Sequence, residues 1–219
     1  MFWCDCSLER RLTFSFLTSS TIIQDIRHLR EAGLATFSYF YFDFRDSSKR
    51  DARSLLSSLL VQLCAQSDPF REVLSALYSE HYQGSQQPSD EALKQCLKKM
   101  LEIPGQGPVY LIIDALDECP NSSGFPTSRE QVLELVQELV DFRLPHLHLC
   151  ITSRPEVDIR ATLESLATHN VSLHEQVGQN QDIINYINSI VHSDPKMRKW
   201  REEDKKLVID TLSRKAGGM

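Results

Sequence analysis

Three carboxylates stand at the end of one apolar segment, and they are the residues of this chain best placed to do chemistry. Five apolar residues at 109–113 run unbroken into Asp114, and Asp117 and Glu118 follow closely. Such a run predicts a strand buried on both faces, as in a parallel sheet covered by helices. Ligands of these sheets bind at the carboxyl ends of the strands, where one carboxylate can hold Mg²⁺ and another can orient an attacking water. The alternative interpretation is a buried strand that runs into an ordinary solvated acidic turn.

A second group of polar residues follows another predicted strand, at residues 147–152. Thr152 ends this strand, and Ser153, Arg154 and Pro155 come directly after it. If the two strands are neighbours, these side chains face the same crevice as Asp114. The planar, forked donors of an arginine suit a phosphate group. The alternative is that Arg154 pairs with a nearby acid and that Pro155 merely starts the next helix.

The rest of the chain alternates between strand and helix patterns, which predicts the scaffold for these residues. An aromatic-rich strand is expected at 37–44 and a short strand at 171–173. This alternation predicts an α/β fold with a doubly wound sheet and a helical C-terminal piece. Helices are predicted at 20–29, 51–66, 68–82, 89–101, 129–141, 156–167, 182–191 and 203–215.

Composition and charge narrow the class of protein. The chain has 219 residues and a net charge of −6, which argues against general nucleic-acid binding because that favours a basic face. No segment reaches the apolar length that a membrane span needs, and the N-terminus lacks the pattern of a secretory signal. The six cysteines are scattered and are expected to be free thiols. These features predict a cytoplasmic protein that binds neither nucleic acid nor membrane.

Four stretches occur in an order that is typical of a known family. The chain resembles the NACHT domain of STAND-type, signal-transducing P-loop NTPases, especially the fungal NLR-like group related to the nephrocystin-3 N-terminal region. The four stretches are Ser-Thr-Ile-Ile-Gln-Asp-Ile at 20–26, Phe-Tyr-Phe-Asp-Phe-Arg-Asp at 40–46, Leu-Ile-Ile-Asp-Ala-Leu-Asp-Glu-Cys at 111–119 and Ile-Thr-Ser-Arg-Pro at 151–155.

The resemblance implies a P-loop NTPase-like doubly wound parallel sheet that binds ATP and Mg²⁺. In that family Asp114 would be the Walker B acid that holds the metal. Asp117 and Glu118 would be the catalytic pair that positions the hydrolytic water, with Glu118 as the base. Thr152 and Arg154 would bind the nucleotide, with Arg154 sensing its terminal phosphate.

The family's phosphate loop, Gly-x-x-x-x-Gly-Lys-Ser/Thr, is missing from its place before residues 20–26. The first glycine of the chain is Gly33 and the first lysine is Lys49. By register, the lysine position falls near Ser15 and the hydroxyl position near Phe16. Glycine backbone and lysine supply the cradle and the neutralising charge for phosphates. We therefore expect ATP binding and hydrolysis to be impaired or very weak.

The missing loop also predicts a sheet that is incomplete at the N-terminus. In this fold the phosphate-loop strand lies between the sensor strand and the last strand, so its loss predicts unpaired edges inside the sheet. Residues 12–16 alternate between apolar and polar types. They are interpreted either as a substitute strand or as unrelated sequence joined by truncation or a faulty gene model.

The resemblance divides the chain into three parts. These are an atypical N-terminal segment at 1–17 in place of the P-loop region, a NACHT-like α/β core at 18–175, and the start of a helical extension at 176–219. The parent architecture implies C-terminal repeats such as ankyrin, and protein partners or self-association through the NACHT module. The leading function is a nucleotide-switch module with a degenerate ATP site. The alternatives are a non-catalytic protein-interaction module and a truncated gene product.

Overall fold

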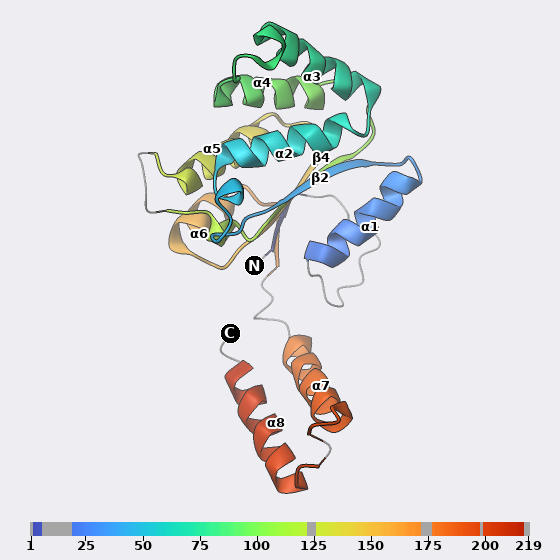
Figure 1. The fold of residues 1–219 in the computed structure, drawn as a ribbon, viewed down its shortest axis with the longest axis vertical. Helices are drawn as coiled ribbons and strands as arrows, with labels where there is room; N and C mark the ends of the chain where they lie inside the picture. Colours follow the sequence, from blue (N-terminus) through green and yellow to red (C-terminus); the bar gives the residue numbers. More distant parts are fainter. Residues whose placement is uncertain (1, 6–18, 122–125, 172–176, 198, 217–219) are drawn as a thin grey trace. The chain divides into compact units, whose positions relative to one another are not determined.

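The computed structural model describes residues 2–5, 19–121, 126–171, 177–197 and 199–216 (Figure 1). The chain divides into two compact units, Phe2–Asn170 and Val171–Met219. The first unit contains the acids at 114, 117 and 118 together with the sheet that carries them. The second unit is built from two helices. The fold class is therefore α/β, as predicted.

The sheet has five strands in the order β2-β3-β4-β1-β5. Strands β2 (Thr36–Tyr41), β3 (Val109–Asp114) and β4 (Leu147–Thr152) are parallel neighbours. Strand β3 is buried from Val109 to Ile113, which explains its unbroken apolar run. This parallel sheet flanked by helices confirms the predicted fold class and is consistent with a P-loop-like arrangement.

Strand β1 (Phe2–Asp5) fills the place between β4 and β5 (His169–Val171). It runs antiparallel to β4, with Phe2 beside Thr152. The expectation of unpaired edges inside the sheet is therefore wrong at β4, which pairs on both sides. The alternating segment at 12–16 lies outside the described residues, so its pairing stays a prediction.

The direction of β1 matters for the site. Its first residues lie at the edge of the sheet where β3 and β4 end, and Asp5 lies beside Leu149, further from that edge. An antiparallel strand in this place leads the chain away from the carboxyl ends of its neighbours. A phosphate loop has to follow its strand at the carboxyl edge. Strand β1 instead ends away from the carboxyl edge of β3 and β4.

Helices cover the faces of the sheet. Helix α1 (Ser19–Glu31) packs Ile23 and Ile26 against side chains on one face of the sheet. Helix α2 (Ala52–Cys64) packs on β2 from the opposite side (Figure 1). Its leucine stripe is fully buried, which confirms the predicted helix. The other helices of this unit are α3 (Asp68–Glu80), α4 (Asp90–Leu101), α5 (Ser128–Asp141) and α6 (Val157–Leu163), with short 3₁₀ turns η1 (Ser47–Lys49), η2 (Tyr82–Gly84) and η3 (Leu116–Glu118).

Two glutamines of the α2 region bond the outer edge of β2, the end strand in the sheet order. Gln62 accepts from the backbone N–H of Tyr39 at 3.1 Å and donates to its carbonyl at 2.7 Å. Gln66 does the same for Phe37, at 3.2 Å and 2.6 Å. Both side chains thereby satisfy groups that an edge strand otherwise presents to other strands. We call this pair the glutamine clasp.

The second unit consists of α7 (Val177–Ser193) and α8 (Glu202–Ala216), which pack against each other. Lys205 is nearly buried in this hairpin and donates to Glu202 at 2.6 Å. Over the described ranges, neither these two helices nor any helix of the first unit is long and apolar enough to cross a bilayer.

Candidate functional site

The chain turns sharply after the first of the three acids. Asp114 ends β3, and Ala115 then adopts a left-handed conformation with φ 54° and ψ 46°. Residues other than glycine are strained there, and such strain persists only where the surroundings fix it. The next turn is η3, whose Leu116 is fully buried and anchors it. Asp117 and Glu118 are thereby held at the end of the strand.

Thr152 joins the ends of β3 and β4. Its hydroxyl donates to Oδ1 of Asp114 and accepts from the backbone N–H of Ala115 at 3.0 Å. Both roles of the hydroxyl are used, so this side chain fixes the acid and the strained turn together. The structure thus brings the two groups of polar residues to the same edge, as the strand pattern predicted.

Asp117 and Arg154 form the second contact between the two turns. The backbone N–H of Arg154 donates to Oδ1 of Asp117 at 3.0 Å, and its Nε lies 3.4 Å from Oδ2. The Asp117 side chain is 10% exposed, whereas that of Arg154 is 82% exposed. The interpretation in which Arg154 pairs with a nearby acid therefore describes the geometry.

Glu118 reaches the turn after β2. Its Oε2 accepts from the backbone N–H of Phe44 at 3.3 Å. Phe44 is 60% exposed, although the sequence pattern places this residue in a buried strand. Strand β2 ends earlier, at Tyr41, which pairs in register with Asp114. Partial burial raises the pKa of Tyr41, and the negative charge of Asp114 adds to this effect.

Arg129 is a part of the site that the sequence reasoning missed. Its side chain is only 7% exposed. Its Nη2 donates to the carbonyl of Asp117 at 2.6 Å, and its Nε donates to the carbonyl of Cys119 at 2.9 Å. Its Nη1 pairs with Glu156 and lies 3.3 Å from Asp158. One buried guanidinium therefore holds the acidic turn against the segment that follows β4.

A signal for this role exists in the helix pattern. Arg129 lies three and seven residues before Val132 and Val136, so it shares their face of α5. Both valines are buried, and the arginine is buried with them. A charged residue on an apolar stripe needs a paired environment, which is the inference the pattern allowed.

A comparison with models of protein families shows the family to which the chain belongs. A model described as nephrocystin 3, N-terminal matches residues 15–154, which is more than half of the chain. The chain belongs to the nephrocystin 3 N-terminal family. The matched region contains the five predicted site residues and ends at Arg154. Comparisons with curated proteins and with solved structures gave no match. The finer likeness to NACHT, STAND-type and fungal NLR-like proteins stays a prediction.

The residues of this nephrocystin 3 N-terminal domain do not fit the Mg²⁺–ATP site that the resemblance implies. Asp114, Asp117 and Glu118 accept hydrogen bonds from three different protein donors. Within the described ranges, no three His, Cys, Asp or Glu side chains converge as metal ligands. The chain has no Gly-Lys pair to supply the cradle and charge of a phosphate loop.

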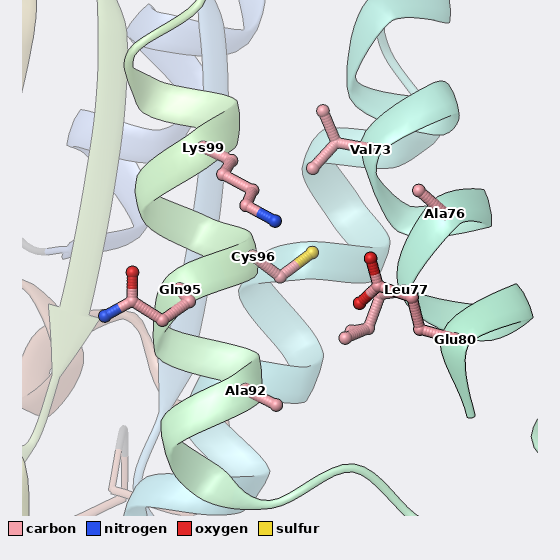
Figure 2. Close-up of a pocket in the computed structure, with 8 residues that line it drawn as sticks. All are labelled: Val73, Ala76, Leu77, Glu80, Ala92, Gln95, Cys96 and Lys99. Atoms are coloured by element: carbon pink, nitrogen blue, oxygen red, sulfur yellow. The ribbon is translucent and has the colours of Figure 1, made fainter.

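The nephrocystin 3 N-terminal domain also has a hollow of about 200 Å³ between α3 and α4. Figure 2 shows Cys96 of α4 pointing into it, with Val73 and Ala76 of α3 on the far side. Glu80 and Lys99 come from opposite helices at its rim. The residues that line it all belong to α3 and α4, so the hollow is separate from Asp114, Asp117 and Glu118.

The two buried cysteines, Cys96 and Cys119, are not candidate nucleophiles. Burial raises the pKa of Cys119 to about 12 and that of Cys96 to about 11. Both thiols therefore stay protonated at neutral pH, and the thiolate is the reactive form. Cys64 and Cys150 are only partly buried.

We expect iodoacetamide at pH 7.5 to alkylate Cys64 and Cys150 at least about tenfold faster than Cys96 and Cys119, because the buried thiols are both shielded and protonated. Peptide mass spectrometry at a series of times measures the four rates. Urea-unfolded protein is the control, in which the four rates should converge. Equal rates in the folded chain would contradict the buried environment of Cys119.

Proposed function

We propose that this chain is a NACHT-like module, of the kind found in fungal NLR-type signalling proteins, that has lost ATP hydrolysis and acts by binding other proteins or copies of itself. As part of this proposal, the module is one domain of a longer protein that carries C-terminal repeats such as ankyrin. That protein works in the cytoplasm. The family match supports the ancestry. The loss of activity rests on one observation, the engagement of all three acids by protein donors.

The contacts of the acids bear on hydrolysis because an ATPase uses the same carboxylate oxygens to bind Mg²⁺ and to orient water. A Walker B carboxylate has to face Mg²⁺ or its water, and a catalytic base has to face the attacking water. Here Thr152 donates to Asp114, and Phe44 donates to Glu118. The chain also lacks the lysine and glycines that supply most of the affinity for phosphates. Three carboxylates without that cradle repel a nucleotide.

A nucleotide switch that still binds ATP is the second candidate. One observation favours it: the Arg154 side chain is 82% exposed, and its contact with Asp117 is made through Nε. The outer guanidinium fork of an arginine held in this way suits a phosphate. In this second candidate, Asp114 keeps the role of metal ligand and Asp117 and Glu118 keep their catalytic roles.

Titration with a fluorescent ATP analogue and Mg²⁺ separates the two candidates. For the whole chain we expect no saturable binding up to about 1 mM nucleotide, which corresponds to a binding free energy weaker than about −4 kcal/mol. The Asp114→Ala and Arg154→Ala variants should give the same flat curve. A micromolar dissociation constant that is lost in Asp114→Ala would reject the proposal in favour of the switch.

Sedimentation velocity over a hundredfold range of concentration tests self-association. We expect any complexes between copies of the chain to form equally with and without Mg²⁺ and ATP. Assembly that requires ATP would again favour the nucleotide switch.

A further inference from the structure

The three acids form a set of contacts with a common geometry. Each acid accepts a hydrogen bond from a different residue, and each contact joins the ends of neighbouring parallel strands or the turns that follow them. We call this set the strand-end latch. Its bonds run to Asp114 from Thr152, to Asp117 from Arg154 and to Glu118 from Phe44.

We propose that the strand-end latch takes the place of a bound nucleotide as the element that holds these three turns together. The module then keeps one fixed shape without Mg²⁺ or ATP. This goes beyond the loss of hydrolysis, because it assigns the acids a structural task. The inference concerns what maintains the shape, and it does not depend on which protein the module binds.

Burial and bonding of Asp117 carry the first step of the argument. Its carboxylate is 10% exposed, and a carboxylate so far removed from water costs free energy unless donors satisfy it. Arg154 supplies a backbone N–H at 3.0 Å and Nε at 3.4 Å, while the nearby hydroxyl of Ser153 donates to the carbonyl of Arg154 at 2.8 Å. The acid is thus surrounded by donors of its own chain.

The nature of the donors carries the second step. Phe44 and Arg154 each give a backbone N–H, and backbone donors in turns need a partner. Glu118 and Asp117 supply those partners at 3.3 Å and 3.0 Å. Both bonds lie where water can reach them. Removing an acid therefore loses a bond between two turns and leaves the backbone donor to water.

The third step is the sign of the effect on stability. Carboxylates gathered to hold a cation repel each other when the cation is absent, so neutralising one of them stabilises the empty protein. Carboxylates that serve as hydrogen-bond acceptors stabilise the fold, so removing one destabilises it. The two assignments therefore predict opposite shifts of the melting temperature.

Thermal unfolding of the whole chain in EDTA measures this sign. We expect Asp117→Ala and Glu118→Ala each to lower the melting temperature by about 3 °C or more. Asp117→Asn and Glu118→Gln keep one acceptor oxygen, so their losses should be smaller. Glu72→Ala is the control, because Glu72 is an exposed acid of α3. The melting temperature of this variant should stay within about 1 °C of that of the parent chain.

The outcomes separate this inference from the proposed function. Higher melting temperatures in the alanine and amide variants would overturn the latch, because they indicate relieved repulsion. If the alanine variants yield no folded protein, the amide variants decide: melting at or below the parent supports the latch, and melting above it rejects the latch. Stabilisation of the parent chain by Mg²⁺–ATP would contradict the loss of nucleotide binding and would leave this sign test intact.

Discussion

Replacing Arg129 with methionine is expected to lower the free energy of unfolding by about 3–5 kcal/mol. The change leaves the carbonyls of Asp117 and Cys119 without the donor that now bonds them at 2.6 Å and 2.9 Å. It also removes the positive charge beside Glu156 and Asp158. These two carboxylates are 45% and 36% exposed, so water screens them and the carbonyl bonds account for most of the loss. Urea unfolding followed by circular dichroism measures the difference.

Two further variants make this prediction specific to the buried guanidinium. Arg129→Lys keeps the charge but has no planar fork, so it should recover less than half of the loss. Arg71→Met is the matched control, because Arg71 forms an exposed pair with Asp68 on α3. Its change should stay within about 0.5 kcal/mol. A loss below about 1 kcal/mol for Arg129→Met would show that the acidic turn does not depend on this residue.

The sequence predicted the parallel part of the sheet because that part rests on apolar patterns. The run before Asp114 and the segment at 147–152 are strands with the expected neighbours. The convergence of Asp114 and Thr152 follows from this, since carboxyl ends of parallel strands share an edge. What the acids do there could not be predicted in the same way. Their partners include the backbone N–H groups of Phe44 and Arg154, which no side-chain pattern reports.

Strand β1 shows a second limit of the sequence. Its four residues, Phe-Trp-Cys-Asp, are too few to display a period, and periodicity carries no information about direction. Its place beside β4 is set by the open edge of that strand, a tertiary effect. Arg129 differs from this case, because its position on the buried face of α5 was readable from the spacing of Val132 and Val136.

The glutamine clasp, like two of the three latch bonds, consists of side chains bonded to the backbone of another element. The leucine stripe of α2 predicts a helix buried on one face and is silent about the polar residues beside that face. Gln62 and Gln66 are four residues apart, so they lie one turn apart on the same side. That spacing lets them reach Phe37 and Tyr39, whose backbone groups point to the same edge of a strand of period two.

Replacing both glutamines with methionine is expected to lower the free energy of unfolding by about 2–4 kcal/mol and to cause association. Methionine has a similar length but neither donates nor accepts strongly, so two N–H groups and two carbonyls of β2 lose their partners. The freed edge can then pair with a strand of another chain. Urea unfolding measures the stability, and static light scattering at rising concentration measures the association.

The controls separate edge protection from the loss of polar side chains in general. Gln95→Met removes an exposed glutamine of α4 that bonds Glu91 at 2.8 Å. This control should change the free energy of unfolding by no more than about 0.5 kcal/mol and should leave the light scattering unchanged. The double change of Gln62 and Gln66 to glutamate keeps acceptors for the N–H groups but places carboxylates against the two carbonyls. It should therefore lose stability without associating, because inward-pointing charge on an edge strand opposes pairing. If both double variants associate, lost stability alone accounts for the association. The glutamine clasp then does not prevent β2 from pairing with a strand of another chain.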